Sequence, residues 1–418
     1  MTVDVREPSQ DMTGRVKGWN TATRWMAMAA IAVLILAIVQ QIEGTNQLTS
    51  SSTWSSALRL GAPILLAGLG GLFSERAGIV NIGLEGMMIA GMWFGAWAGW
   101  QYGPWTGVAL GVAGGAVFGL IHAVATVTFA VDQIVSGVAI NILAPASVRF
   151  LSSVIYTPDT GGGITQSPRI KDFIKTFDVP WLSNWLVDIE EKAWFFVSDL
   201  AGILGGFVTN MSWLTVIVLF LVPFSWWLLW KTAWGLRLRS VGENPWAAES
   251  LGVAVIRMKY WGVTISGAFA GLAGAYLVVV SQGIYREGST AGRGFIGLAA
   301  LIFGNYNPFG VLAGAGVFGY SQALSLRAGA VHALLLLVAV GLLVLAVYAI
   351  YQKKFANAGI QAAFAVGFYF WWATSDVVAN QIITATPYVI TLLVLAMATQ
   401  RLRMPAADGI PYRKGEAH

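Results

Sequence analysis

The sequence predicts an all-α protein that crosses a membrane many times. Of its 418 residues, 56% are hydrophobic and 11% are charged, whereas soluble domains carry roughly 25% charged residues. The mean hydropathy is +0.67. Apolar runs near the length of roughly 20 residues that spans a bilayer recur along the chain, so we expect about 10–12 transmembrane helices. They should form one transmembrane domain over residues 1–418.

The apolar runs give the expected crossings in order. The first follows Arg15, Lys17 and Arg24, and no small-residue cleavage site follows it, so we expect an uncleaved helix after a cytoplasmic segment 1–24. In chain order the runs cover residues 25–39, 57–73, 84–100, 105–130, 134–151, 213–230, 260–280, 311–326, 333–350, 361–372 and 388–398, with a shorter apolar piece at 294–304.

The charges between these runs predict the orientation. Cytoplasmic loops carry an excess of Lys and Arg. Segment 231–259 and the tail 401–418 are basic, and they contain Arg237, Arg239, Arg257, Lys259, Arg401, Arg403, Arg413 and Lys414. Segment 152–212 carries seven acidic and four basic residues, so it belongs outside the cell. Both termini should then face the cytoplasm.

An internal repeat is visible in the glycine-rich motifs. GLGGLF at 68–73, GIVNIGL at 78–84, GPWTGV at 103–108 and VFG at 117–119 recur as GLAGAY at 271–276, GRGFIGL at 292–298, NPFGVL at 307–312 and VFG at 317–319. The charge pattern predicts opposite orientations for the two copies, 57–130 and 260–326. Inverted repeats place a substrate path at their interface. The alternative is chance similarity between glycine-rich helices.

Polar residues inside the apolar runs predict where such a path lies. The stretch SERAGIVNIGLEGMMIAG, residues 74–91, interrupts one hairpin, and residues 292–308 form a matching second break. Asn81 and Glu85 are four residues apart, which predicts one helical face. The solute-path candidates are Asn81, Glu85, Asn141, Phe295 and Asn305. Amides and a ring suit a neutral, polar, ring-bearing solute, although the same side chains also serve as contacts between helices.

No motif for catalysis or metal binding is present. The sequence contains no phosphate-binding loop, zinc-protease motif or nucleophile elbow, and the absence of cysteine excludes thiolate metal sites. We expect His122 and His332 to be packed, hydrogen-bonded side chains. The basic residues lie in short clusters beside apolar runs, so no nucleic-acid partner is expected. The chain should not be an enzyme, and it should bind no cofactor or metal itself.

A polar stretch between two apolar runs reads LRLRSVGENPWAAESLGVAVIRMK, residues 236–259. Asn244 is a good N-cap, Pro245 suits the first helical position and Gly252 can end the helix. The expected helix has about two turns, too short to be stable unless something packs on it. Ala247, Ala248 and Leu251 would dock on a partner protein. The alternative is a helix lying in the headgroup layer, anchored by Trp246.

This stretch resembles the cytoplasmic coupling loop of ATP-binding-cassette (ABC) importer permeases. Two further stretches, GLFSERAGIVNIGLEGMMIAGMWFGAWAG and GFIGLAALIFGNYNPFGVLAGAGVFG, resemble the branched-chain amino acid and simple-sugar permeases, closest to their nucleoside-uptake branch. The C-terminal PYVITLLVLAMATQRLRMPAADGIPYRKGE is similar to that branch too. The region 157–210 is longer than the family pattern, and 329–382 forms an extra helical hairpin.

The resemblance implies a type II importer permease in a bacterial cell membrane that moves nucleosides by alternating access. Its partners would be cytoplasmic ATPase subunits that bind ATP and Mg²⁺, a second permease chain in a heterodimer, an extracytoplasmic solute-binding lipoprotein and membrane lipid. The residues implied in coupling to the ATPase are Gly235, Arg239, Gly242, Glu243, Asn244, Ala247, Ala248 and Gly252.

Three alternatives remain at this stage. An ion-coupled secondary carrier shares inverted repeats and broken helices, but it needs no docking loop. A membrane-embedded enzyme needs paired catalytic groups, and none is evident. Within the permease family, the solute could be a ribose-like sugar or a branched-chain amino acid, although an amino acid needs groups for both an ammonium and a carboxylate.

Overall fold

The computed structural model describes residues 21–156, 161–375 and 402–415, and single positions between 378 and 385. Most of these residues are helical and only four of them lie in β-strands, which confirms the all-α prediction. The α-helices are α1 (Thr21–Glu43), α2 (Ser51–Arg76), α3 (Leu84–Tyr102), α4 (Pro104–Ala123), α5 (Gln133–Ile155), α6 (Leu182–Glu191), α7 (Val197–Gly205), α8 (Trp213–Lys231), α9 (Ala233–Glu243), α10 (Pro245–Ser250), α11 (Val255–Tyr276), α12 (Arg293–Phe303), α13 (Pro308–Ser325), α14 (Ala328–Tyr351) and α15 (Phe355–Thr374). Short π-helices η1 (Val124–Thr128) and η3 (Leu277–Gln282) extend α4 and α11.

The protein is a multi-pass membrane protein. Six helical spans in the described residues are long and apolar enough to cross a membrane: Ser51–Arg76, Pro104–Thr128, Gln133–Ile155, Trp213–Lys231, Val255–Gln282 and Gly329–Tyr351. Ala30–Glu43 and Arg293–Phe303 are shorter apolar helices. The expected run 388–398 and residues 1–20 lie outside the described residues, so the total of about 10–12 crossings stays a prediction.

The two sequence repeats have matching elements that run in opposite directions. The first consists of α2, α3 and α4, and the second of α11, α12 and α13. Arg76, at the end of α2, contacts Glu243 of α9. Lys259, near the start of α11, donates to the carbonyl of Gly78, which follows α2. The end of α2 therefore lies beside the start of α11, so the two helices run in opposite directions. The third helix of each repeat begins with a proline, Pro104 or Pro308.

Each repeat contains a non-helical break, which we call the first break (residues 77–83) and the second break (residues 283–292). Gly78 in the first has φ +76° and Gly292 in the second has φ +73°, a left-handed conformation that favours glycine. The sequence predicted the second break at 292–308, but most of that stretch is the helix α12. The apolar piece 294–304 is long enough to form three helical turns, and the break precedes it.

Glycines allow the repeats to pack closely. A Cβ on Gly115 of α4 would lie 2.3 Å from the carbonyl oxygen of Gly267 on α11, and one on Gly61 of α2 would lie 2.9 Å from that of Ala315 on α13. Small residues at such crossings let helix backbones approach in a membrane, where packing rather than hydrophobic burial holds helices together. The first helix of each repeat therefore packs against the third helix of the other.

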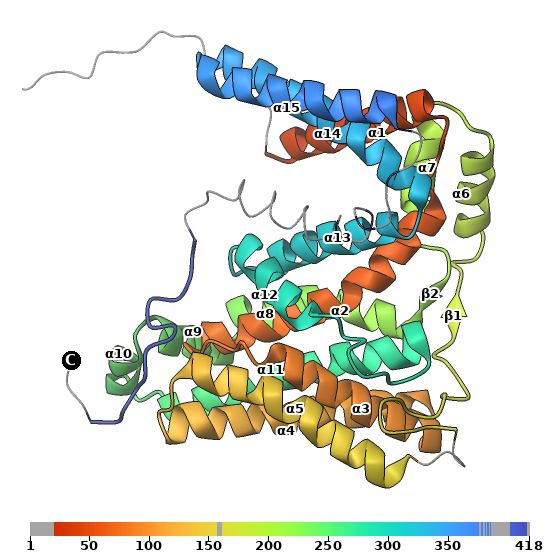
Figure 1. Ribbon diagram of the computed structural model, residues 1–418. Coiled ribbons are helices and arrows are strands. Elements are labelled where there is room, and N and C mark those ends of the chain that lie inside the picture. Colours follow the sequence, from red (N-terminus) through yellow and green to blue (C-terminus); the bar gives the residue numbers. More distant parts are fainter. Residues whose placement is uncertain are drawn as a thin grey trace, which may run out of the picture.

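A second layer, formed by α1, α14 and α15, lies beside this core (Figure 1). A small cluster of buried side chains, including Val39, Ala333 and Leu336 of the layer and Leu324 of α13, joins it to the core. Glu43 at the end of α1 joins the three helices: His332 Nδ1 lies 2.5 Å from Glu43 Oε1, and Trp372 Nε1 donates to Glu43 Oε2 at 2.7 Å. The two helices α14 and α15 correspond to the extra hairpin expected at 329–382.

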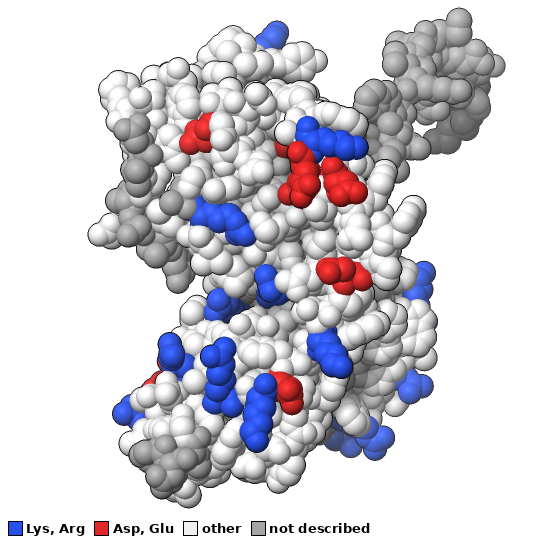
Figure 2. Space-filling model, turned by 90° about the vertical axis from the view of Figure 1, so that its right-hand side faces the viewer, with Lys and Arg blue, Asp and Glu red and all other residues white. Residues whose placement is uncertain are grey.

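The two ends of the molecule differ. One end carries α9 and α10, and the other carries α6, α7 and a two-stranded antiparallel sheet of β1 (Thr176–Phe177) and β2 (Met211–Ser212) (Figure 1). Segment 152–212 is thus partly helical rather than a plain loop. On the face seen in Figure 2, acidic side chains lie mostly in the upper part and basic ones mostly in the lower part.

Candidate functional site

The first break is held by buried hydrogen bonds. Asn81 is fully buried, and its Nδ2 donates to Ser266 Oγ on α11 at 2.9 Å. The backbone N–H of Val80 donates to Gln133 Oε1 on α5 at 2.6 Å. The expectation that Asn81 and Glu85 share a helical face is wrong, because α3 begins at Leu84 and Asn81 precedes it. Glycines at 78 and 83 favour the irregular backbone there over an earlier helix start.

Asn141 of α5 completes the start of α3. Its Oδ1 accepts a hydrogen bond from the N–H of Gly86 at 2.8 Å, and its Nδ2 donates to the carbonyl of Ile82 at 3.0 Å. The N–H groups in the first turn of a helix have no partner inside the helix. The Asn141 amide therefore acts as a cap supplied by a neighbouring helix.

Glu85 joins the two breaks. Its Oε1 accepts from the N–H of Gly292 at 2.9 Å and its Oε2 accepts from the N–H of Gly294 at 2.6 Å. The carboxylate is 7% exposed and lies at the start of α12, where the helix dipole and unpaired N–H groups favour an anion. A Cβ on Gly294 would lie 2.6 Å from the backbone of Glu85, so glycine is needed there. The helices α3 and α12 are thus joined at their N-termini.

Phe295 lies in the first turn of α12, on an exposed face of the chain. Its side chain is 46% exposed.

Arg149 of α5 forms an ion pair with Glu287 of the second break, with Arg149 Nη1 lying 3.5 Å from Glu287 Oε1. The sequence reasoning missed this pair. An arginine inside the apolar run 134–151 was the available signal, because charged residues in such runs are rare and often functional.

The structure does not bring Asn305 to the other four solute-path candidates. Asn305 lies in the turn after α12, at the end of that helix opposite to Gly292, with φ +50°. Its Oδ1 accepts a hydrogen bond from the N–H of Arg403 at 2.7 Å. The sequence placed it in the path because it lies within the expected break 292–308, but residues 293–303 are helical and carry Asn305 away from Glu85.

The predicted short helix is present as α10. Asn244 Oδ1 accepts from the N–H of Ala247 at 2.9 Å, Pro245 is the first helical residue, and Gly252 has φ +80°. The side chain of Leu251 is 84% exposed and Ala247 is also exposed. Ala248, expected on the docking surface, is 2% exposed and faces the core. The available docking surface consists of Ala247 and Leu251, while Ala248 seats the helix.

Three of the coupling candidates lie in α9 and hold α9 in place. A Cβ on Gly235 would lie 2.1 Å from the carbonyl oxygen of Leu228, and one on Gly242 would lie 2.3 Å from that of Arg76. Arg239 Nε donates to the carbonyl of Leu229 at 2.9 Å, and its guanidinium lies over the Trp230 ring. These three residues fix α9 against α8 and the end of α2.

Glu243 lies between α9, α2 and the C-terminal residues. Its Oε1 is 3.7 Å from Arg76 Nη1, and its side chain is 53% exposed while that of Arg76 is 10% exposed. Arg76 Nη2 donates to the carbonyl of Tyr306 at 2.8 Å. The sequence reasoning missed Arg76. Its signal was a charged Glu-Arg pair at residues 75–76, where a crossing helix ends.

Both histidines are packed as expected. His122 Nδ1 is 2.8 Å from Ser136 Oγ, and its Nε2 is 3.3 Å from the carbonyl of Val80. His332 contacts Glu43, as described above. Within the described residues, no group of three or more His, Asp or Glu side chains is placed to hold a metal ion.

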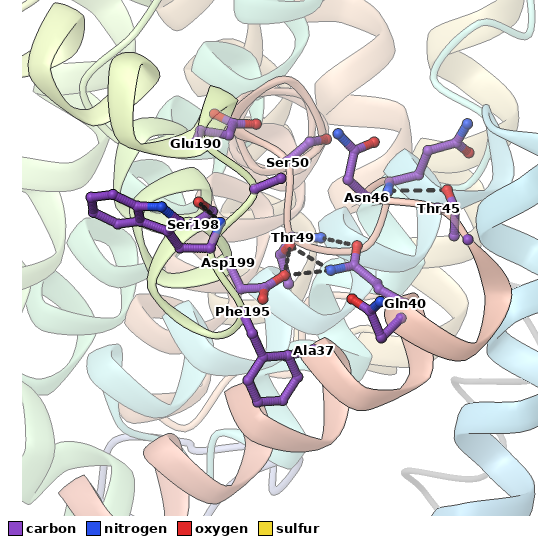
Figure 3. Close-up of a pocket in the computed structure, with 15 residues that line it drawn as sticks. Ala37, Gln40, Thr45, Asn46, Thr49, Ser50, Glu190, Phe195, Ser198 and Asp199 are labelled. Carbon is purple, nitrogen blue, oxygen red and sulfur yellow. Dashed lines mark hydrogen bonds between the residues drawn. The ribbon is translucent and has the colours of Figure 1, made fainter.

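A cavity of about 550 Å³ lies between α1, the α1–α2 loop and the α6–α7 hairpin (Figure 3). Gln40 Nε2 and Thr49 Oγ1 both donate to Asp199 Oδ1, at 2.5 and 2.7 Å. The N–H of Ser51 donates to Glu190 Oε1 at 3.0 Å. The polar side chains are therefore bonded to one another and hold the hairpin on α1, which makes this region a structural junction.

Comparisons of the sequence with known proteins identify its family. Residues 53–347 match the family described as branched-chain amino acid transport system / permease component. The guanosine ABC transporter permease protein NupQ of Bacillus subtilis is 36% identical over 368 residues, which cover 85% of this chain and 94% of the relative. The nucleoside ABC transporter permease protein NupC of Lactococcus lactis is 33% identical, with the same two shares covered.

A more distant relative is the putative glucose ABC transporter permease protein TsgC13 of Haloferax volcanii. It is 32% identical over 273 residues, which cover 63% of this chain and 74% of the relative. No solved structure matched the chain. The family match covers both repeats, both breaks and the α9–α10 region, and the chain belongs to the family of branched-chain amino acid transport system permease components.

Proposed function

We propose that this chain is the membrane-spanning permease subunit of an ABC importer that takes up nucleosides. The observation that carries the proposal is the match in sequence to guanosine and nucleoside permeases over 85% of the chain. The exposed α10, with Leu251 at its end, supplies a surface for an ATPase. The sequence match favours a nucleoside importer over a sugar or branched-chain amino acid importer. The α10 surface favours an ATPase-driven importer over an ion-coupled carrier.

The solute path in this proposal runs along the exposed face that carries Phe295. An aromatic ring stacks on a nucleobase whatever its hydrogen-bonding pattern. Asn81, Glu85 and Asn141 shape this wall from behind. Asn81 lies in the first break and bonds to Ser266 of α11. Asn141 bonds to the Ile82 carbonyl in the first break, and Glu85 to the Gly292 N–H in the second. The exposed apolar residues of α5, among them Ile142 and Phe150, face a second permease chain, which we take to be a homologous but different one.

The remaining partners follow from the importer mechanism. Two cytoplasmic ATPase subunits bind ATP and Mg²⁺ and contact α10, and an extracytoplasmic binding lipoprotein delivers the solute to the α6–α7 end. The α9–α10 end and both termini face the cytoplasm of a bacterial cell. ATP moves the path between its two openings only because ATP and solute favour different conformations.

Reconstitution tests the function. The chain is combined with its ATPase, a candidate second permease and the binding protein in liposomes, and ATP hydrolysis is measured with adenosine, guanosine, ribose or leucine. Stimulation by nucleosides alone is the expected result. Stimulation by ribose or leucine alone would contradict the nucleoside assignment, and uptake that survives ATP depletion but follows an ion gradient would indicate a secondary carrier.

The docking surface is tested by Leu251→Asp. The Leu251 side chain makes few contacts within the chain, so the variant should insert and fold normally. A charge in the centre of a docking site costs about 2 kcal/mol or more, so co-purification of the ATPase should fall about 30-fold. The matched control is Leu251→Met. Crosslinks from an introduced Cys at Ala247 should reach the ATPase, and crosslinks to lipid alone would contradict docking.

The path is tested by Phe295→Ala and Phe295→Tyr. Loss of a stacking ring costs about 1–3 kcal/mol, so the alanine variant should raise the KM for guanosine about 5–150-fold. The tyrosine variant keeps the ring and should transport normally. Phe309→Ala is a control with similar exposure, 49% against 46%. An unchanged KM in Phe295→Ala would contradict a solute path that includes Phe295.

A further inference from the structure

Residues 402–415 cross the end of the molecule that carries α9 and α10 (Figure 1). The N–H of Ala407 donates to the carbonyl of Gly242 at 2.9 Å, and the N–H of Ala406 donates to Glu243 Oε2 at 3.2 Å. Both acceptors belong to the last two residues of α9, immediately before the cap of α10. Ala407 is 4% exposed, so the segment is built into the junction of these helices.

The later part of the segment holds α10 itself. The Tyr412 ring lies 5.9 Å from the Trp246 ring at an angle of 61°, a favourable edge-to-face geometry. Tyr412 is 8% exposed. Trp246 is the second residue of α10, so the six-residue helix is packed against the segment through its largest side chain.

The earlier part of the segment is bonded to the second repeat. The N–H of Arg403 donates to Asn305 Oδ1 at 2.7 Å, and Asn305 lies in the turn that ends α12. The opposite end of α12 is bonded to Glu85 of α3. One continuous chain of contacts therefore runs from α10 through residues 412–403 to α12, and on to the two breaks.

The first break touches the same segment. A Cβ on Gly78 would lie 3.2 Å from the carbonyl oxygen of Ala407 and 3.2 Å from the Cα of Gly242. Three backbones thus meet closely at Gly78, and the Lys259 ammonium, 3.1 Å from the same Cβ position, packs beside them. Close backbone packing of this kind transmits displacement, because a packed contact cannot be compressed.

We propose that residues 402–415 form a coupling strap, which transmits the movement of α10 to α12 and to the first break. The inference rests on the proposed function, because it needs an ATPase that moves α10. Within the described residues, α10 otherwise packs mainly on α9 and on α11. Without the strap, α10 could move while α12 stayed in place.

Two pairs of variants test the strap. Asn305→Gly keeps a residue that accepts the positive φ but removes the acceptor for Arg403, whereas Asn305→Asp keeps both. Tyr412→Leu removes the ring on Trp246, and Tyr412→Phe retains it. In the reconstituted complex, Asn305→Gly and Tyr412→Leu should lower guanosine uptake at least about fivefold, the factor that corresponds to one typical hydrogen bond. Their ATPase should still co-purify, and Asn305→Asp and Tyr412→Phe should take up guanosine at wild-type rates.

A distance measurement gives a second readout. The chain contains no cysteine, so spin labels can be placed at Ser250→Cys on α10 and Ile302→Cys on α12, both at exposed positions. With the strap intact, ATP should leave the distance between the labels unchanged because the helices move together. In Asn305→Gly, ATP should change it.

Several results would overturn the strap. One is normal uptake in both Asn305→Gly and Tyr412→Leu; another is a distance that responds to ATP equally with and without the Asn305 acceptor. Equal losses in all four variants would indicate a purely structural role for the segment and contradict transmission. A wild-type complex whose ATP hydrolysis no nucleoside stimulates would refute the nucleoside function instead. The distance measurement with ATP alone would still show whether the strap transmits the movement of α10.

Discussion

Glu85 shows how one side chain organises both repeats. Its two oxygens bond to the N–H groups of Gly292 and Gly294, so the start of α12 depends on a residue more than 200 positions earlier in the chain. The carboxylate and the helix dipole attract each other. This arrangement also explains why a broken helix can exist in an apolar environment, where an unpaired backbone group is costly.

Replacing Glu85 tests that role. In Glu85→Ala, two buried N–H groups lose their acceptor, so the free energy of unfolding in detergent should fall by about 1–3 kcal/mol for each group. Glu85→Gln keeps one acceptor oxygen and should lose less. Denaturant titration of the purified protein measures both variants. Equal stability of wild type and Glu85→Ala would show that the bonds contribute nothing.

At the scale of elements, close helix crossings depend on glycine. A Cβ on Gly91 of α3 would lie 2.3 Å from the Cα of Gly271 on α11, whereas one on Gly316 of α13 would meet nothing within 4 Å. Gly91→Ala should therefore force the two backbones apart and lower the stability by about 1–3 kcal/mol. Gly316→Ala should be neutral or stabilising by up to about 1 kcal/mol, because alanine favours helix. Thermal unfolding in detergent compares them, and equal midpoints would contradict the close crossing.

The coupling strap should respond to pH. Burial raises the pKa of Asp408 to about 7 from its ordinary value of 3.8, although Lys259 nearby favours the ionised form; Glu75 and Arg76 also act on it. A carboxyl whose pKa is raised on docking binds its proton more tightly when docked. Docking of the strap is therefore strongest below the undocked pKa of about 4 and weakens as the pH rises through about 7.

A spin label measures this pH dependence. The label at Ala406→Cys lies at an exposed position of the strap, and it should be less mobile at pH 6 than at pH 8. In Asp408→Asn this carboxyl cannot ionise, so the change in mobility between these values should be much smaller than in the wild type, although Glu75 and Lys259 remain beside it. A pH response of wild-type size in Asp408→Asn would assign the effect to another group.

The whole molecule consists of the two-repeat core and the layer of α1, α14 and α15. The layer meets the core in a small buried cluster to which α13 contributes Leu324, and Glu43 links the three helices of the layer through hydrogen bonds. Glu43→Ala removes the carboxylate that bonds to His332 Nδ1 and Trp372 Nε1. Regions with few shared buried contacts open independently, so the layer should loosen while the core stays intact.

Hydrogen exchange tests this separation. In Glu43→Ala, exchange in α14 and α15 should accelerate about 10-fold, as expected for a loss of about 1–2 kcal/mol, while exchange in α3, α4 and α11 should not change. Ile42→Ala, at a 55% exposed neighbouring position, is the control. Acceleration throughout the core would show that the layer and the core unfold together.

The sequence by itself determined the membrane fold, the inverted repeat and α10, because apolar run length, glycine motifs and the Asn244-Pro245 cap act locally. It also identified Glu85 and Asn141 as important polar residues, but it could not find their partners. Only the tertiary structure decided that Glu85 caps α12, that Asn305 bonds to Arg403, and that Ala248 faces inward. These contacts join residues far apart in the chain, and no local pattern specifies which distant N–H group a buried oxygen will meet.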